Sequence, residues 1–208
     1  MSHSTMTRLT LAWIALATAG LAAGPEPTRK VIWDFEADAP SGPAEGLVAE
    51  VGRWEVASDG KNRVFAQRAE SPDAVFNLAL TEQAKARDLD LSVRLRAVDG
   101  KVDRGGGLVW RAKDKANYYV ARSNPLENNL RVYKVVDGVR TQLGTAEVPG
   151  DLAWHTLRVS MLGNKITCQL DGKTYLEVVD ATFARPGLVG LWTKADARTD
   201  FDDLTLAD

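Results

Sequence analysis

Arginines interleaved with aromatic residues are the first candidates for a binding chemistry in this sequence. Residues 104–140 read RGGGLVWRAKDKANYYVARSNPLENNLRVYKVVDGVR and contain five arginines. Guanidinium groups donate hydrogen bonds to hydroxyl, carboxylate or phosphate oxygens, and aromatic rings stack on sugar rings or bases. Such a segment suits a nucleic-acid surface, a sugar-binding surface, or the solvated outer face of a β-sheet.

The overall charge argues against a nucleic-acid partner. The 208 residues carry a formal net charge of −2, with a pI near 5.8. Domains that bind nucleic acid usually have a pI above about 9. The charged fraction of 26% and the hydrophobic fraction of 45% are typical of a globular chain. The length predicts one domain with a large core.

Most of the chain alternates apolar and polar residues as β-strands do. In residues 89–97, LDLSVRLRA, every second residue is apolar. Turn sequences rich in Gly, Asp and Asn separate such segments, and the one helical pattern is TEQAKARD at 81–88. We therefore predict an all-β, two-sheet antiparallel sandwich. Further strands are predicted at 31–36, 63–68, 74–80, 107–113, 117–122, 130–136, 154–161, 165–171, 174–179, 187–194 and 201–206.

The same alternation predicts which side chains point away from the core. In residues 187–194, for example, Trp192 and Lys194 share a face opposite Val189 and Leu191. If these strands adjoin in one curved sheet, its concave face carries guanidinium groups beside aromatic rings, which suits sugar hydroxyls and C–H faces. The alternative is a wet sheet face that only keeps the sandwich soluble. The predicted ligand-binding residues are Arg111, Arg122, Tyr133, Trp192 and Lys194, with Asn124, Glu127 and Asn128 in the loop at the sheet edge.

Nucleophilic and zinc chemistry find little support in the sequence. Cys168 shares a strand face with Ile166 and Leu170, so it is predicted to be a small buried residue. His155 falls in phase with Leu157, which favours a core histidine over a catalytic base. One cysteine and one histidine beyond the N-terminal segment form no zinc-binding motif.

The first residues have the layout of a secretory signal peptide. An apolar run, LTLAWIALATAGLAA, follows one positive charge and precedes small residues and prolines. We predict a signal peptide at 1–22, a tether at 23–29 and a single domain at 30–208, secreted or periplasmic and free of the membrane after cleavage. The alternative is an uncleaved membrane anchor.

Acidic residues gather near both ends of the predicted domain. If the first and last strands lie side by side, the sequences VIWDFEAD and TDFDDLTL bring several carboxylates together. Their repulsion would be relieved by a structural Ca²⁺, for which Asp34, Asp200 and Asp202 are the predicted ligands. The alternative is a metal-free network in which Lys and Arg side chains pair with these acids. No other cofactor is predicted.

The C-terminal quarter of the chain resembles a known family. Residues 154–208 contain WHTLRV, a turn, a strand ending in DGK, then GLVGLWTK and a closing FDDL. This looks like the C-terminal half of a concanavalin A-like jelly roll. Over roughly residues 30–207 the chain resembles secreted bacterial domains of the family-16-glycoside-hydrolase-like type, related to 3-keto-glycoside lyases and hydratases. The resemblance implies a jelly roll and a carbohydrate ligand.

The catalytic motif of the retaining family-16 enzymes is absent. That motif has the form E-x-D-x-x-E, and its nearest match here is EADAPS. Glu36 and Asp38 fit, but Ser41 replaces the third carboxylate and Pro40 interrupts the strand. Three functions therefore remain open: a non-catalytic carbohydrate-binding domain, an enzyme acting on glycosides or keto-glycosides, and a structural or protein-binding domain of the cell envelope.

Overall fold

The computed structural model describes residues 29–208, so the predicted signal peptide and most of the tether lie outside the described residues. Every regular element in this range is a β-strand, and none of it is a helix that could cross a membrane. The strands are β1 (Lys30–Trp33), β2 (Leu47–Val51), β3 (Trp54–Asp59), β4 (Asn62–Gln67), β5 (Phe76–Ala86), β6 (Leu89–Asp99), β7 (Gly106–Asp114), β8 (Asn117–Asn124), β9 (Asn129–Val136), β10 (Val139–Glu147), β11 (His155–Leu162), β12 (Lys165–Leu170), β13 (Lys173–Val179), β14 (Gly187–Lys194) and β15 (Arg198–Ala207).

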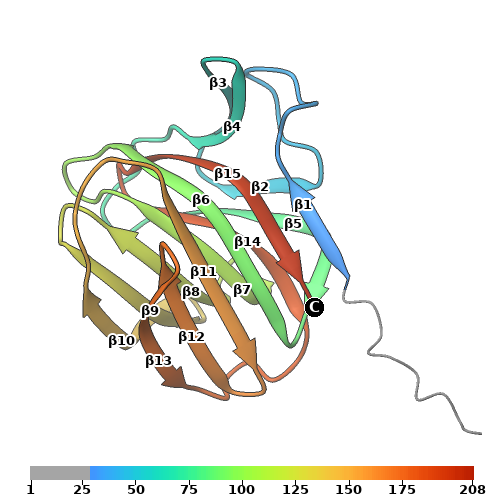
Figure 1. The fold of residues 1–208 in the computed structure, drawn as a ribbon, viewed down its shortest axis with the longest axis vertical. Coiled ribbons are helices and arrows are strands. Elements are labelled where there is room, and N and C mark those ends of the chain that lie inside the picture. Colours follow the sequence, from blue (N-terminus) through green and yellow to red (C-terminus); the bar gives the residue numbers. More distant parts are fainter. Residues whose placement is uncertain (1–28) are drawn as a thin grey trace, which may run out of the picture.

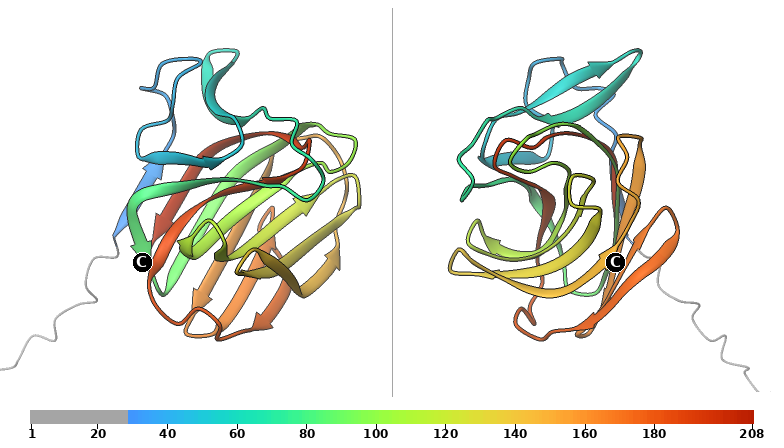
Figure 2. Two further views of the ribbon diagram at one scale, coloured as in Figure 1. Left: turned by 180° about the vertical axis from the view of Figure 1, so that it is seen from behind. Right: turned by 90° about the vertical axis from the view of Figure 1, so that its left-hand side faces the viewer.

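The strands form two antiparallel sheets that pack face to face (Figures 1 and 2). The eight-stranded sheet has the order β13-β12-β11-β6-β15-β4-β3, with β1 paired to the end of β15. The seven-stranded sheet has the order β10-β9-β8-β7-β14-β5-β2. The predicted all-β sandwich is confirmed, and so is the predicted pairing of the first and last strands, in which Trp33 faces Leu204.

Short Asp-Gly turns fix the register of several hairpins. Asp137 and Gly138 have φ of 49° and 80°, and Asp171 and Gly172 have φ of 50° and 79°. Two successive positive φ angles define the type I′ turn, whose twist matches that of paired strands. The DG sequences at these two positions therefore close β9–β10 and β12–β13 as the sequence predicts.

Side chains that point between the sheets make one continuous core. Its largest members include Trp110 of β7 and Tyr119 of β8, whose rings stack at 5.5 Å. The indole nitrogen of Trp110 donates to the sulfur of Met161 on the opposite sheet at 3.1 Å. Cys168 is fully buried in this core, as predicted, and burial raises the pKa of its thiol to about 12.

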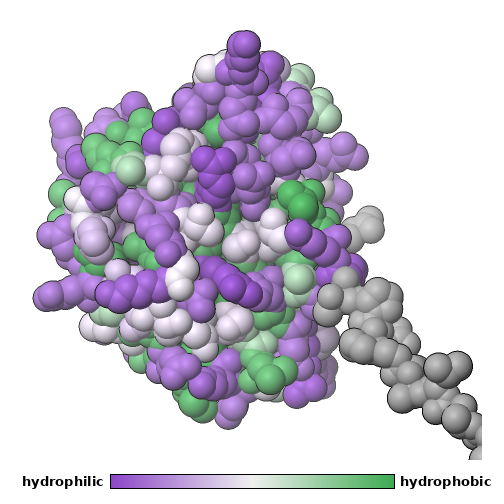
Figure 3. Space-filling view, in the orientation of Figure 1, coloured by the Kyte–Doolittle hydropathy of each residue, from purple (hydrophilic) through white to green (hydrophobic). Residues whose placement is uncertain are grey.

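The outer face of the eight-stranded sheet is solvated. Figure 3 shows this side of the molecule as mostly hydrophilic, with only small, scattered apolar areas. Arg158 of β11 pairs with Asp90 of β6 across this face. This sheet follows the simple rule of apolar residues inside and charged residues outside.

The predicted helix at 81–88 is wrong. Residues 81–86 continue β5, where Lys85 pairs with Leu188 and Ala86 with Gly187 of β14. Sheet pairing and the burial of Ala86 override the modest helix propensity of this segment. Strands β2, β3 and β10 were not predicted, because β2 and β10 are mostly exposed and lack a clean apolar alternation.

Arg111 does not lie on the outer face of the seven-stranded sheet, which corrects its predicted position. A bulge interrupts β7 between Trp110 and Asp114, and Arg111 has a φ of 47°. Its side chain turns to the end of the sandwich, where its nitrogens donate to the carbonyl oxygens of Arg87 at 2.7 Å, Phe183 at 2.8 Å and Gly163 at 2.7 Å. The guanidinium thereby joins three chain segments beneath the surface.

We expect Arg111→Met to lower the free energy of unfolding by about 2–4 kcal/mol, because several buried carbonyl oxygens lose their donors. The matched control is Lys113→Met, an exposed neighbour that should change stability by less than about 0.5 kcal/mol. Urea unfolding of both variants measures the difference. Equal stability of the two variants would contradict the role given to Arg111.

Candidate functional site

Four of the five predicted ligand-binding residues gather on the outer face of the seven-stranded sheet, the face turned away from the eight-stranded sheet. Arg122 lies on β8, Tyr133 on β9, and Trp192 and Lys194 on β14. The Arg122 guanidinium reaches the Tyr133 hydroxyl at 3.4 Å. On the same strand, β8, Tyr118 packs on this outer face and Tyr119 packs in the core.

The aromatic residues of this face form a second apolar cluster. Trp192 is only 1% exposed, donates to the Tyr118 hydroxyl at 3.3 Å and packs on Phe76 at 5.4 Å between ring centres. The Arg140 guanidinium lies over Tyr133 at 4.4 Å and extends towards Trp192 at 5.9 Å. These rings are therefore a rigid support covered by Arg140, and they do not form an open stacking platform.

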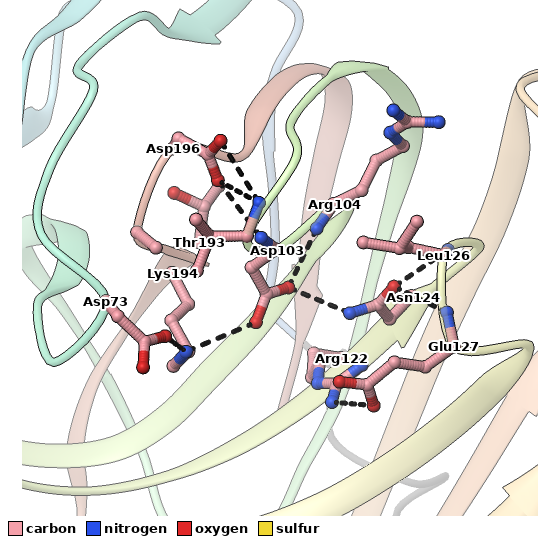
Figure 4. A network of polar contacts seen from close by, with 12 residues as sticks. Asp73, Asp103, Arg104, Arg122, Asn124, Leu126, Glu127, Thr193, Lys194 and Asp196 are labelled. Carbon is pink, nitrogen blue, oxygen red and sulfur yellow. Dashed lines mark hydrogen bonds and ion pairs between the residues drawn. The ribbon is translucent and has the colours of Figure 1, made fainter.

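A network of charged side chains adjoins this aromatic cluster, where Arg122 reaches the Tyr133 hydroxyl. Figure 4 shows the charged side chains of this network. The Lys194 ammonium forms an ion pair with Asp73 and lies 3.7 Å from Oδ2 of Asp103. Oδ1 of Asp103 accepts from the Asn124 amide at 2.8 Å and from the backbone N–H of Arg104 at 2.9 Å. We call the following residues the rim cluster: Asp73, Asp103, Arg122, Asn124, Glu127 and Lys194.

Glu127 forms the second half of the rim cluster. Its Oε2 accepts from Arg122 at 2.9 Å and from the amide of Asn129 at 3.1 Å, and Arg131 lies 2.9 Å from the same oxygen. The Glu127 side chain is 40% exposed, whereas that of Arg122 is only 2% exposed. A buried guanidinium thus holds an accessible carboxylate in a fixed orientation.

Backbone features position the acids of the rim cluster. The Asp196 carboxylate accepts three successive backbone N–H groups, at residues 101–103, and so folds the loop that carries Asp103. A Cβ atom at Gly107 would lie 1.8 Å from a carbonyl oxygen of β8, and one at Gly105, where φ is 104°, would lie 2.2 Å from another. Glycine at these positions lets the loop press against β8, which brings Asp103 to Asn124.

The two carboxylates of the rim cluster differ in acidity. Burial raises the pKa of Asp103 above its usual value, against the opposing influence of Arg122 and Lys194. Burial acts in the same direction on Glu127, but hydrogen bonds from Arg122 and Asn129 outweigh it and lower the pKa of Glu127 to about 2. Glu127 therefore stays ionised to lower pH, and Asp103 takes up a proton more readily.

The structure brings four residues named in the sequence analysis into the rim cluster: Arg122, Asn124, Glu127 and Lys194. Tyr133 lies beside them, within reach of Arg122. Asp73 and Asp103 of the cluster, and Arg140 over the aromatic rings, were not predicted. The sequence did contain a signal for Asp103, which lies between the Asp99-Gly100 turn and the glycines at 105–107. Such glycines indicate a close approach of two backbone segments.

Two of the three acids predicted to bind calcium are paired with other side chains in this structure. Asp200 pairs with Arg68 at 2.7 Å and Arg96 at 2.8 Å, and Asp202 with Asn62 at 2.9 Å and Arg94 at 3.2 Å. Asp34 only accepts a local backbone N–H, and residues 29–208 contain no group of three potential ligands that could hold a metal ion. Asp200 and Asp202 thus form the arginine network that was the alternative to Ca²⁺, and calcium binding stays a prediction.

His155 does not lie in the core, which corrects the prediction from its strand phase. It is the first residue of β11, is partly buried, and its ring bonds to Asp171 at 2.7 Å and to Asp151 at 2.9 Å. Burial alone would lower the pKa of His155, but the two carboxylates outweigh it and raise the pKa. The ring therefore connects the β12–β13 turn, which contains Asp171, to the loop before β11, which contains Asp151.

We expect the stabilising effect of His155 to depend on pH. Because its pKa is raised in the folded state, the contribution of His155 is complete below its unfolded pKa of about 6.5 and is lost as pH rises through the folded value. The loss of unfolding free energy in His155→Gln should therefore be larger at pH 5.5 than at pH 9. Urea unfolding at both values measures it, and a loss independent of pH would show that the ion pairs are not the cause.

Trp192→Ala should lower the free energy of unfolding by about 3–5 kcal/mol, because it empties space beneath the outer face. Val139→Ala, at a position that is 69% exposed, is the control and should have little effect. Chemical unfolding measures the loss of stability, and so distinguishes a structural role of Trp192 from the ligand-binding role that the sequence predicted. A Trp192→Ala variant that keeps its stability and loses only ligand binding would restore Trp192 as a contact residue.

Comparison with known proteins identifies the architecture. No protein-family model and no curated protein sequence matches the chain. Among solved structures, carbohydrate binding module CBM66 from Bacillus subtilis aligns with a TM-score of 0.68 and 21% identity, over 78% of this chain and 96% of that one. A Bacillus subtilis protein of unknown function with a galectin-like fold aligns with a TM-score of 0.64 and 8% identity, over 86% and 97% of the two chains.

Enzymes share the same fold. The Crh5 transglycosylase in complex with NAG aligns with a TM-score of 0.59 and 11% identity, over 86% of this chain and 83% of that one. At these identities the likeness concerns the fold alone. The chain is therefore a two-sheet antiparallel β-sandwich that shares the jelly-roll fold of these structures.

Proposed function

We propose that this chain is an exported, non-catalytic carbohydrate-binding domain that takes its ligand at the rim cluster. The observation that carries the proposal is the fixed set of acceptors and donors beside an aromatic cluster. Glu127 and Asp103 offer carboxylate oxygens to sugar hydroxyls, while Arg122 and Lys194 offer N–H groups. Hydroxyl groups on adjacent carbons of a sugar suit such alternating partners.

The charge balance of the rim cluster favours a neutral sugar. Glu127 is balanced by Arg122 and Arg131, and Lys194 lies between Asp73 and Asp103. With the cations already paired to acids, the cluster has little net charge to attract an ion. Its hydrogen-bonding groups therefore suit uncharged hydroxyls.

One buried donor of the rim cluster lacks a partner. Nε of Arg122 is buried and makes no hydrogen bond to the described residues, although both terminal nitrogens of this guanidinium are bonded. A buried unpaired N–H costs free energy, so an acceptor that reaches it would stabilise the complex. Because Nε is closed to solvent, a sugar hydroxyl oxygen supplies such an acceptor once a covering side chain moves aside.

Two further lines support the proposal. A carbohydrate binding module is among the solved structures that share this fold. The N-terminal segment at 1–22, which contains the apolar run, has the composition of a signal peptide, and this fits export to a compartment that contains glycans. A structural or partner-binding role in the cell envelope is the alternative without a carbohydrate ligand.

A specific observation favours a second candidate function, an enzyme acting on glycosides. Asp103 and Glu127 belong to one network, and their pKa values are shifted in opposite directions. Two carboxyl groups with separated pKa values are what acid–base chemistry on a glycosidic bond needs. A keto-glycoside lyase or hydratase would require only one positioned base and one donor to the developing oxyanion.

The binding proposal predicts the effect of two substitutions. For a neutral glycan identified by array screening, Glu127→Gln and Lys194→Met should each weaken binding about tenfold or more, because each removes a charge-assisted hydrogen bond. Glu177→Gln and Lys165→Met are the matched controls, since this exposed ion pair lies on the eight-stranded sheet. Calorimetric titration measures all four affinities.

Two outcomes would contradict the proposal. Unchanged affinity in both rim variants, with their melting temperatures retained, would place the ligand elsewhere. Conversion of the bound glycan to new reducing ends or altered keto-sugars, abolished by Asp103→Asn, would instead establish the enzyme. The proposal expects the glycan to be recovered intact.

A further inference from the structure

A cavity lies at the end of the seven-stranded sheet opposite to the rim cluster. Its volume is about 500 Å³, within the range of small-molecule sites. Four cationic residues contribute to its lining and no acidic residue does. We call it the basic cavity, and its cationic residues are Lys85, Arg111, Lys113 and Arg185.

The fold brings these cations together from separate segments. Lys85 lies at the end of β5, Lys113 at the end of β7, and Arg185 in the segment that leads into β14. Leu188 of β14 pairs with both Lys85 and Ala112, so the three strands end side by side. The residues between β13 and β14 complete the wall, with Phe183 and Pro186 as apolar members.

The positive charge of the basic cavity is not balanced by its surroundings. Within residues 29–208, Lys85, Lys113 and Arg185 form no ion pair; Arg111 has only Asp88, at 3.5 Å, which also accepts the N–H of Gly163. Asp180 directly follows β13, and its carboxylate is already engaged. It accepts hydrogen bonds from the Tyr119 hydroxyl, from the Lys134 ammonium and from the backbone N–H of Thr182.

An adjoining cavity extends the positive region. Its volume is about 280 Å³, and Arg111 and Ala184 line both cavities. Arg87 joins the lining there and also forms no ion pair within the described chain. Because Arg111 is pinned by three carbonyl oxygens, its charge stays fixed between the two cavities while the other cations remain free to move onto a ligand.

We propose that the basic cavity binds a sugar-sized anion, a monosaccharide unit that carries a phosphate, sulfate or carboxylate group. The anionic group is held by Lys85, Lys113 and Arg185 near the fixed charge of Arg111. The apolar lining from Phe183, Pro186 and Leu188 contacts the C–H face of the ring. This site is separate from the rim cluster and differs from it in taking a charged ligand.

The test is a titration of the full chain at low ionic strength with glucose 6-phosphate, glucuronic acid, inorganic phosphate and glucose. At least one of the two anionic sugars should bind saturably and more tightly than inorganic phosphate, with glucose bound weakest. Which anionic sugar binds distinguishes a phosphate from a carboxylate as the recognised group. Raising the salt concentration should weaken the binding, because it screens exposed cations.

Substitutions locate the binding. Lys113→Gln with Arg185→Gln should weaken it about tenfold or more, and both sites are exposed enough to leave the fold intact. Lys61→Gln on the β3–β4 hairpin is the matched control, and Glu127→Gln at the rim cluster should also leave it unchanged. The proposal is overturned if neither anionic sugar binds saturably, if glucose binds as tightly, or if the double variant binds like the control.

Discussion

A buried guanidinium group needs hydrogen-bond acceptors for its N–H groups, because it has lost its contacts with water. The seven-stranded sheet contains two such groups. Arg111 and Arg122 are each only 2% exposed. An arginine cannot shed its charge at ordinary pH, so its surroundings must adapt to it. Arg111 lies towards one end of β7, and Arg122 pairs across from Gly107 near the other end. The structure at each end of this sheet depends on which atoms accept the hydrogen bonds of its buried guanidinium group.

At the Arg111 end the acceptors are backbone carbonyl oxygens from three separate segments. Carbonyl groups carry no net charge, so this arrangement fixes the chain while leaving the region positive. At the Arg122 end the acceptors are side chains, chiefly Glu127 and Asn129. A carboxylate cancels the charge and remains accessible to a ligand. One end of the sheet therefore suits anions and the other suits neutral hydroxyl groups.

Strand alternation predicted the fold and the outer face well, because side-chain direction follows from the backbone wherever a strand is regular. It placed Arg122, Tyr133 and Lys194 on the outer face for this reason.

Strand alternation failed at Arg111, where a bulge adds a residue and reverses the expected direction of the side chain. It failed for His155, because bonds to Asp171 and Asp151 hold the ring of this residue at a partly buried position. Trp192 points outward as predicted, but the depth of its cover depends on Arg140, which comes from a strand that was not predicted. Asp103 was missed because its position depends on a loop held by Asp196, about ninety residues away in the chain.

The central claim is that the Arg122 corner of the sheet receives the sugar, and nuclear magnetic resonance of the ¹⁵N-labelled chain tests it most directly. The Nε–H signal of Arg122, assigned by its loss in Arg122→Lys, reports on the one buried donor of that guanidinium without a partner. On saturation with a bound neutral glycan, this signal and the backbone signals of residues 103 and 124–127 should shift. The Nε–H signal of Arg111, already bonded to a carbonyl oxygen, should stay in place. Shifts confined to other surfaces, with the Arg122 signal unmoved, would contradict the account.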